Sequence, residues 1–283
     1  MTGHESAPDV EGQVAPHADG LGMTWRVGVL VAVAVACAVI AFSGAPVRDS
    51  IQYFDFADVR SLLGIPSAMN VLSSGAFVAA GLSGIAAMLG GRVTFRDGRE
   101  RAPWLVFFAG VTLAGLGTGA FHLDPSAASL ALDRFPMTLG FTGLIAALLA
   151  ERVDAAWGRR LLWPLVGLGL ASMVWWWVTD RTGTVDLRPY MLVQFFSLLA
   201  VPLLLLLFPS PYSGSSLYLL ALGLYVIGKV AEGSDGEIFR MGGIVSGHTL
   251  KHLLSAAAVG VVAWMLVRRE PLERGLAAPA DSR

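Results

Sequence analysis

The sequence predicts an all-α protein, a polytopic bundle of transmembrane helices. Of its 283 residues, 55% are hydrophobic and only 14% are charged, against about 25% charged in a typical soluble domain. The apolar residues gather in blocks of roughly 17–25, the length that a helix needs to cross a hydrocarbon core about 30 Å thick. Cys37 is the only cysteine, which excludes a disulfide framework and a thiolate metal site.

Eight candidate spans follow one another along the chain. We expect them at residues 25–44, 66–89, 103–122, 134–151, 161–179, 190–208, 215–231 and 246–267. The preceding residues 1–24 are polar and rich in Gly and Pro, which predicts a disordered tail. Residues 268–283 form a second, short polar tail.

The arginines predict the orientation. They cluster after the second, fourth and eighth spans, at Arg92, Arg96, Arg99 and Arg101, at Arg152, Arg159 and Arg160, and at Arg268 and Arg269. With eight spans these clusters fall on one side of the membrane, which the positive-inside rule makes cytoplasmic. Both tails are then cytoplasmic. Eighteen arginines against two lysines, with abundant Ala and Gly, suggest a GC-rich bacterial source and hence the inner membrane.

Three of the five histidines lie inside apolar sequence. His122 ends the third predicted span, His248 begins the eighth and His252 follows one helical turn deeper, while Asp133 comes at the start of the fourth. All four then lie in the outer half of the membrane. Ionisable side chains in a bilayer are costly and indicate a functional site. Positions i and i+4 share a helix face, and a catalytic zinc takes three protein ligands and leaves one position for water. The sequence therefore predicts a zinc site.

Other interpretations remain open. Membrane histidines commonly form interhelical hydrogen bonds, and an HxxxH spacing also arises by chance. Asp133 could instead cap the fourth helix at its N-terminus. The histidines and Asp133 could also form the proton relay of a transporter. Haem ligation by His248 and His252 is disfavoured because axial ligands approach iron from opposite sides. No basic run indicates a nucleic-acid partner, and the oligomeric state stays open.

The sequence around these residues resembles the alkaline ceramidase family. In GTGAFHLDPSAASLALDRFPM, a Phe-His pair is followed eleven residues later by the Asp of an L-D-x-x-P-M motif, as in that family. SGHTLKHLLSA resembles its closing helix, and MNVLSS around Asn70 its first core helix, with Ser74 where Asn is usual. The resemblance implies that Asn70 and Ser74 are structural or pocket-lining polar residues. YFDFADVRSLLGIP and DLRPYMLVQF resemble its bacterial branch. The resemblance covers about residues 52–267 and implies a seven-helix catalytic core within residues 45–267, to which the helix at 25–44 is an addition.

The resemblance implies roles for individual residues. It places zinc at His122, His248 and His252, an acid/base role at Asp133 and an oxyanion donor at Thr118. Packing within the small-residue stretch GLGTGA is the alternative for Thr118. The implied activity is zinc-dependent hydrolysis of the N-acyl amide of ceramide or a similar membrane lipid. A receptor-like, non-catalytic member of the wider superfamily is the other implied possibility.

Calcium is a further possibility that the resemblance raises. Asp55 and Asp58 lie near the position of the family's calcium site, although Ser67 replaces a glutamate of that site. Calcium takes six to eight oxygen ligands, so these two aspartates would supply only part of a site.

Four further polar residues fall in predicted spans or at their ends, and they could form buried pairs or line a pocket. They are Gln194, Lys229, Glu232 and Lys251. Lys251 lies about 100° from His252 around the helix, so we expect it either to snorkel to the membrane interface or to pair with an acid such as Glu232, rather than to act in catalysis.

Overall fold

The computed structural model describes residues 18–48 and 55–272, with side chains from residue 23 onward, and it confirms the all-α transmembrane fold. Eight of the described helices are long and apolar enough to cross a membrane. The helical elements are α1 (Ala18–Ser43), α2 (Ala68–Leu89), the 3₁₀ turn η2 (Gly98–Glu100), α3 (Arg101–Leu123), α4 (Ala127–Arg152), α5 (Ala155–Arg181), α6 (Arg188–Leu207), α7 (Ser216–Gly233), α8 (Asp235–Gly242) and α9 (Gly247–Arg268).

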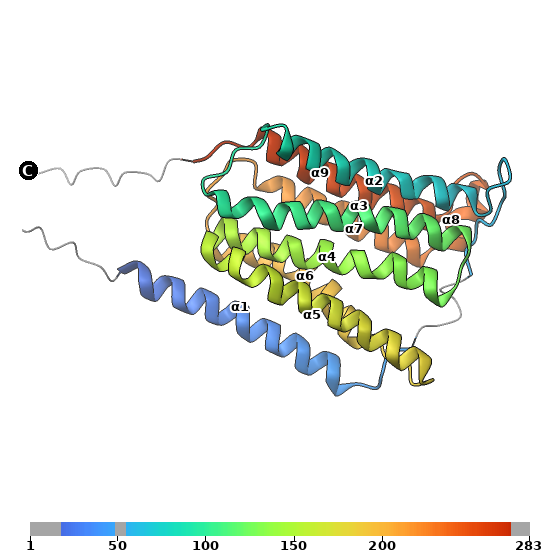
Figure 1. Cartoon of the computed structure of the whole chain (residues 1–283), viewed down its shortest axis with the longest axis horizontal. Coiled ribbons are helices and arrows are strands. Elements are labelled where there is room, and N and C mark those ends of the chain that lie inside the picture. Colours follow the sequence, from blue (N-terminus) through green and yellow to red (C-terminus); the bar gives the residue numbers. More distant parts are fainter. Residues whose placement is uncertain (1–17, 49–54, 273–283) are drawn as a thin grey trace, which may run out of the picture.

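The long helices run roughly parallel or antiparallel along the bundle (Figure 1). Helices α2, α3 and α4 pack in sequence order, α6 packs on α4, and α9 packs between α7 and α2. Helices α6 and α7 contact each other only sparsely. The N-terminal helix α1 lies outside the bundle against α6, and none of its most apolar window is buried. One face of α1, which includes Val27 and Leu30, is partly covered by the bundle, and its other apolar side chains face the surroundings.

Three predicted helix starts are wrong by six or seven residues, and one of them is that of α5, which begins at Ala155 rather than at position 161. Helix α1 begins at Ala18, so residues 18–24 are helical rather than part of a disordered tail, while residues 1–17 lie outside the described part of the chain. Helix α4 begins at Ala127, seven residues before the predicted position 134. The Ser126 side chain caps it by accepting a hydrogen bond from the Ser129 N–H, and Ser129 bonds back in a reciprocal capping box. Sequence reasoning overlooked this cap.

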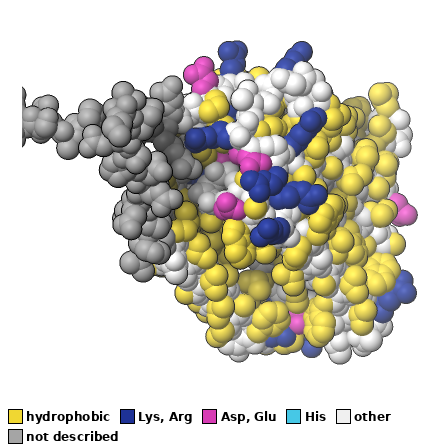
Figure 2. All heavy atoms as spheres, turned by 60° about the vertical axis from the view of Figure 1, so that its left-hand side comes forward, with side chains coloured by type: hydrophobic (Ala, Val, Ile, Leu, Met, Phe, Trp, Pro, Cys, Tyr) yellow, Lys and Arg dark blue, Asp and Glu magenta, His cyan; other side chains and the backbone are white. Residues whose placement is uncertain are grey.

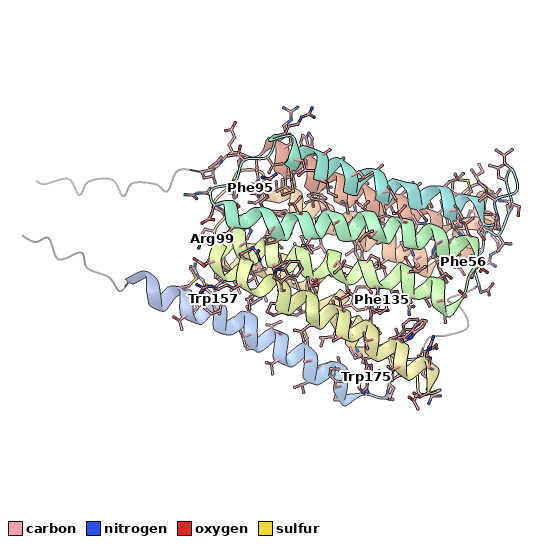
Figure 3. All side chains as sticks on the ribbon, in the orientation of Figure 1. Phe56, Phe95, Arg99, Phe135, Trp157 and Trp175 are labelled. Carbon is pink, nitrogen blue, oxygen red and sulfur yellow. The ribbon has the colours of Figure 1, made fainter. Side chains whose placement is uncertain are left out.

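The two ends of the bundle differ in charge. The start of α1 and the end of α9 lie at the left-hand end in Figure 1, and Arg99 lies at that end in Figure 3. The predicted arginine clusters follow α2, α4 and α9 and so share this end, where Figure 2 shows basic side chains gathered above largely hydrophobic flanks. Phe56 lies at the opposite end (Figure 3).

A buried polar cluster closes the arginine-rich end. Arg269, in the predicted C-terminal tail, is only 5% exposed and forms an ion pair with Glu151. Its guanidinium lies 3.8 Å from the ring centre of Tyr212, whose hydroxyl donates to Glu100 at 2.7 Å. Tyr218 donates to the same oxygen of Glu151 at 2.9 Å. The start of the tail is thus packed into the bundle.

Candidate metal site and cavity

The three histidines predicted as ligands come together from two distant parts of the chain. His122 lies near the end of α3, and His248 and His252 lie in the first two turns of α9. One potential ligand atom from each residue lies within 4.8 Å of the other two. Ring centroids are 4.7–5.1 Å apart, and the side chains of His122 and His252 are almost fully buried. The group could hold a metal ion.

The hydrogen bonds of His252 determine which of its nitrogens is available. Its Nδ1 lies 2.9 Å from the Oγ of Ser73, and that hydroxyl donates its one proton to the carbonyl of Asn70 at 3.0 Å. Nδ1 must therefore carry the ring proton and donate it to Ser73. Nε2 is then the unprotonated nitrogen, and it is buried with no hydrogen-bond partner among the described residues. An orphaned imidazole nitrogen with a fixed tautomer suits a metal ligand.

The other two imidazoles face each other through the same type of nitrogen. Nε2 of His122 lies 3.2 Å from Nε2 of His248. Two nitrogens held at about 2.05 Å from a tetrahedral zinc are about 3.3 Å apart, so this separation suits a shared ion. Phe56 covers the pair, with ring centroids 4.6 Å from His122 and 4.8 Å from His248. The donor set and its apolar cover fit the predicted zinc.

Asp133 and Thr118 form a pair beside the histidines. The hydroxyl of Thr118 on α3 donates a hydrogen bond to the carboxylate of Asp133 on α4. Asp133 lies two turns inside α4 rather than at its start, so the alternative that it caps this helix is wrong. The hydroxyl proton of Thr118 is directed at Asp133, and the oxyanion role of Thr118 stays a prediction.

A close helix contact brings this pair together. A Cβ atom added at Gly117 would lie 2.0 Å from the carbonyl oxygen of Leu132, so only glycine allows α3 and α4 to approach this closely. Pro136 lies four residues after Leu132 and has no N–H to bond that carbonyl. The proline of the L-D-x-x-P-M motif thus leaves the Leu132 carbonyl without its helical hydrogen bond at the point where Gly117 packs. Gly117 directly precedes Thr118, and Leu132 directly precedes Asp133.

Asp235, which sequence reasoning did not single out, fixes the start of α9. One carboxylate oxygen accepts from the backbone N–H of His248 at 2.7 Å, and the other accepts from the N–H of Ala57 at 2.9 Å. A carboxylate is favoured at a helix N-terminus, where backbone N–H groups lack partners within the helix. Asp235 therefore joins the segment that carries Phe56 to the helix that carries two of the candidate ligands. Its position depends on the short helix α8, which the hydropathy pattern did not reveal.

Three charged side chains from two helices lie next to His248. Glu232 on α7 accepts from Lys229 and, at 2.7 Å, from Lys251 on α9. This confirms the expected Lys251–Glu232 pair. Lys251 Nζ also lies 3.3 Å from Nε2 of His248.

Gln194 on α6 donates to the hydroxyl of Tyr225 on α7 at 2.7 Å, across the sparse α6–α7 contact.

The candidate ligands and the charged residues beside them face one cavity of about 200 Å³. At one end it is lined by the polar residues Thr118, His122, Asp133, Lys229, Glu232, His248, Lys251 and His252. The rest of its wall is mostly apolar and extends to Phe107, Tyr218 and Val262. From His248 to Val262 along α9 is 14 residues, or about 21 Å at 1.5 Å per residue. From Glu232 to Tyr218 along α7 gives the same length, about 21 Å. The cavity therefore has a polar head and a long apolar body.

Asn70 and Ser74, the predicted structural polar residues, are buried near this site on α2. Asn70 accepts a hydrogen bond from the hydroxyl of Thr249 at 2.8 Å, which joins α2 to α9. The hydroxyl of Ser74 bonds the Asn70 carbonyl within its own helix at 2.8 Å. The hydroxyl of this helix that hydrogen-bonds a histidine is that of the neighbouring Ser73, and Phe77 packs edge-on against the same His252.

The two aspartates considered for calcium are placed differently from each other. Asp55 is exposed, whereas Asp58 is buried and receives two hydrogen bonds from the Arg60 guanidinium, at 2.8 and 2.7 Å. These hydrogen bonds hold the pKa of Asp58 below its ordinary value. Arg60 also donates to the carbonyls of Gly243 and Ile244. Asp58 thus already has a cationic partner, and calcium binding stays a prediction.

Fold and site together define an integral membrane protein with a three-histidine candidate metal site inside a helical bundle. No family model matches this chain, and no curated protein matches it either. The resemblance to alkaline ceramidases therefore depends on its sequence motifs alone.

Proposed function

We propose that this protein is a zinc-dependent intramembrane amidohydrolase that cleaves the N-acyl amide of ceramide or a ceramide-like lipid. The observation that carries the proposal is the convergence of three imidazoles and the Thr118–Asp133 pair at the polar end of a long apolar cavity. A single acyl chain can lie along the apolar body while its amide reaches the polar end.

His122, His248 and His252 would hold the zinc, and their spacing and the orphaned Nε2 of His252 support this assignment. A zinc in such a site supplies Lewis-acid polarisation of the amide carbonyl and a water of lowered pKa. The Asp133 carboxylate would take a proton from the attacking water and return it to the leaving amine. Thr118 holds that carboxylate in place. The apolar wall and Phe56 limit access of bulk water.

The arginine distribution supports an orientation. The predicted clusters all lie at the end opposite the histidines, and the positive-inside rule favours the cytoplasm for that end. We place both termini in the cytoplasm of a bacterial cell and the site toward the outer face of the inner membrane. Reporter fusions at either terminus, active only in the cytoplasm, would test this.

Metal analysis combined with a cleavage assay tests the activity. The purified protein should contain about one zinc per chain, as three-histidine catalytic sites do, and should release fatty acid from a ceramide or a related N-acyl lipid. Alanine at His122, His248 or His252 should remove both zinc and cleavage, whereas Asp133→Asn should keep zinc and lose cleavage.

Two outcomes favour the alternatives. Zinc without cleavage of any N-acyl lipid, and without product in lipid profiles of expressing cells, would favour a receptor-like protein. Substrate flux into sealed vesicles without new products would favour a proton-coupled transporter.

A further inference from the structure

Lys251 lies on the face of α9 that carries the two histidines. Successive residues of a helix are about 100° apart, so Lys251 is about 60° from His248 on one side, and His252 is about 40° from it on the other. All three side chains line the cavity. The angle of Lys251 to His252, considered alone, hid its closeness to His248. Its Nζ lies 3.3 Å from Nε2 of that histidine.

The ammonium of Lys251 can serve its partners and still offer a donor to the cavity. An ammonium has three N–H donors. One is directed at Oε1 of Glu232, 2.7 Å away, and this ion pair holds the charge in place. Nε2 of His248 is the other contact. A metal bound at that nitrogen takes the lone pair to which Lys251 would donate. Loading the site with metal therefore releases a donor beside the candidate ligands.

The hydroxyl of Thr118, the predicted oxyanion donor, is engaged elsewhere. A hydroxyl has one proton, and that of Thr118 is directed at the Asp133 carboxylate. While this hydrogen bond lasts, Thr118 offers no proton to a carbonyl oxygen. A donor aimed at the carbonyl oxygen is a main source of rate acceleration in amide hydrolysis, so Lys251 is the group to test for this role.

We infer that Lys251 is a further catalytic residue, which donates a hydrogen bond to the carbonyl oxygen of the amide as negative charge develops on it. This inference rests on the proposed amide hydrolysis and assigns its oxyanion donor. Water adds to the carbonyl carbon, and the electron pair of the C=O bond moves onto the oxygen that Lys251 contacts. Asp133 takes the proton of the water and returns it to the leaving amine as the C–N bond breaks. Lys251 keeps its own protons, and the products are a fatty acid and an amine.

Glu232 positions the ammonium for this role. It lies on α7 and accepts from Lys251 through Oε1 and from Lys229 through Oε2, so each oxygen has its own lysine. The Lys251 side chain is only 19% exposed. A donor that is already held in position needs no reorganisation when charge develops, and this is what makes electrostatic stabilisation effective.

Separate measurement of kcat and KM tests the role. Lys251→Met removes the N–H donors but keeps a long, unbranched side chain. With a palmitoyl ceramide as substrate and zinc-loaded protein, kcat should fall by about 10²–10³-fold, the usual loss for one oxyanion donor. KM should change little, because the interaction is made only as the oxyanion forms. Lys251→Arg keeps N–H donors and should recover most of the activity. An unchanged kcat in Lys251→Met overturns the inference.

A binding measurement separates this role from a structural one. The probe is a hexadecyl phosphonamidate of ethanolamine, in which a tetrahedral phosphorus with anionic oxygen replaces the amide carbonyl. The corresponding hexadecyl urea is its planar, uncharged counterpart. Because transition-state analogues report interactions that the substrate lacks, Lys251→Met should weaken phosphonamidate binding by about 10²-fold or more. Binding of the urea and zinc content should stay the same. Equal weakening for both probes, or loss of zinc, indicates a structural role and overturns the inference.

Lys229→Met is the matched control, because it removes the other lysine of Glu232 and leaves Lys251 in place. If pairing with Glu232 were the whole role of Lys251, the two variants would lose equal amounts of kcat. We expect the loss in Lys251→Met to be larger by about tenfold or more, and equal losses contradict the inference.

The same assay distinguishes this inference from the proposed function. No cleavage of any N-acyl lipid by the unsubstituted protein contradicts the hydrolase, and the oxyanion role with it. Equal cleavage by the unsubstituted protein and Lys251→Met contradicts the oxyanion role alone and leaves the hydrolase intact.

Discussion

Ser73 Oγ accepts the proton of His252 Nδ1 across the contact between α2 and α9, and this one hydrogen bond leaves Nε2 of the histidine unprotonated. Partners of this kind orient metal-ligating histidines and raise their basicity. The first core helix thus contributes to the candidate site without supplying a ligand.

Removing this partner should weaken metal binding. We expect Ser73→Ala to reduce zinc affinity by about 10–100-fold, the usual effect of losing such a contact, because the ring of His252 can then rotate and change tautomer. Competition with a zinc-sensitive dye measures this affinity. Ser83→Ala is the control, since Ser83 lies on the same helix but is exposed and bonds only its own backbone. Unchanged affinity in Ser73→Ala would contradict the assigned tautomer.

Gly117 should be intolerant of a methyl group. Gly117→Ala forces α3 away from the Leu132 carbonyl and should destabilise the fold by about 1–3 kcal/mol, the usual range for overpacking. It should also separate Thr118 from Asp133, so cleavage should fall much more than zinc content. Gly119→Ala is a close control, because its added Cβ would make only an ordinary 3.8 Å contact. Thermal unfolding, zinc content and lipid cleavage are measured together on both variants. Equal activity in the two would refute the role of this close approach.

In the proposed hydrolase, the depth of the cavity should determine the length of the substrate's acyl chain. A staggered chain advances about 1.25 Å per carbon, given bonds near 1.5 Å, so the length of about 21 Å accepts roughly 16–17 carbons. Ala258 lines the wall ten residues after His248, about 15 Å along α9. We expect Ala258→Leu to shift the preference toward chains of about 12 carbons. A series of N-acyl lipids of graded length tests this, with the exposed neighbour in Ala257→Leu as the control.

Low pH should destabilise the segment that carries Phe56, because it contains the Asp58–Arg60 pair. Arg60 lowers the pKa of Asp58 from its ordinary value of 3.8, so the pair stabilises the fold fully above that value and loses its contribution as pH falls through the lowered pKa. The difference in unfolding temperature between the unsubstituted protein and Asp58→Asn should be constant above about pH 5 and shrink below 3.8. Thermal scans from pH 7 to pH 3 check this. A difference that grows toward acid would contradict the assigned pairing.

The sequence predicted the fold and the three histidines because both depend on strong local signals. Apolar blocks of membrane length define spans, and histidines within them are rare and costly. The start of α4 was misplaced because residues 127–133, which include the polar Ser129 and Asp133, precede its apolar run, and hydropathy does not detect the Ser126 cap. Ser73 and Asp235 were missed because their roles depend on contacts with residues 179 and 13 positions away, which no local pattern encodes.

The contact between Tyr218 and Glu151 at the far end of the cavity has a consequence for the membrane itself. A cavity about 21 Å deep leaves only about 9 Å of a 30 Å hydrocarbon layer between its floor and the opposite surface. In that interval Tyr218, Glu151 and Arg269 are buried and bonded to one another. We expect this plug to keep protons and ions from passing between the cavity and the arginine-rich end of the bundle, so that the protein does not dissipate a membrane potential.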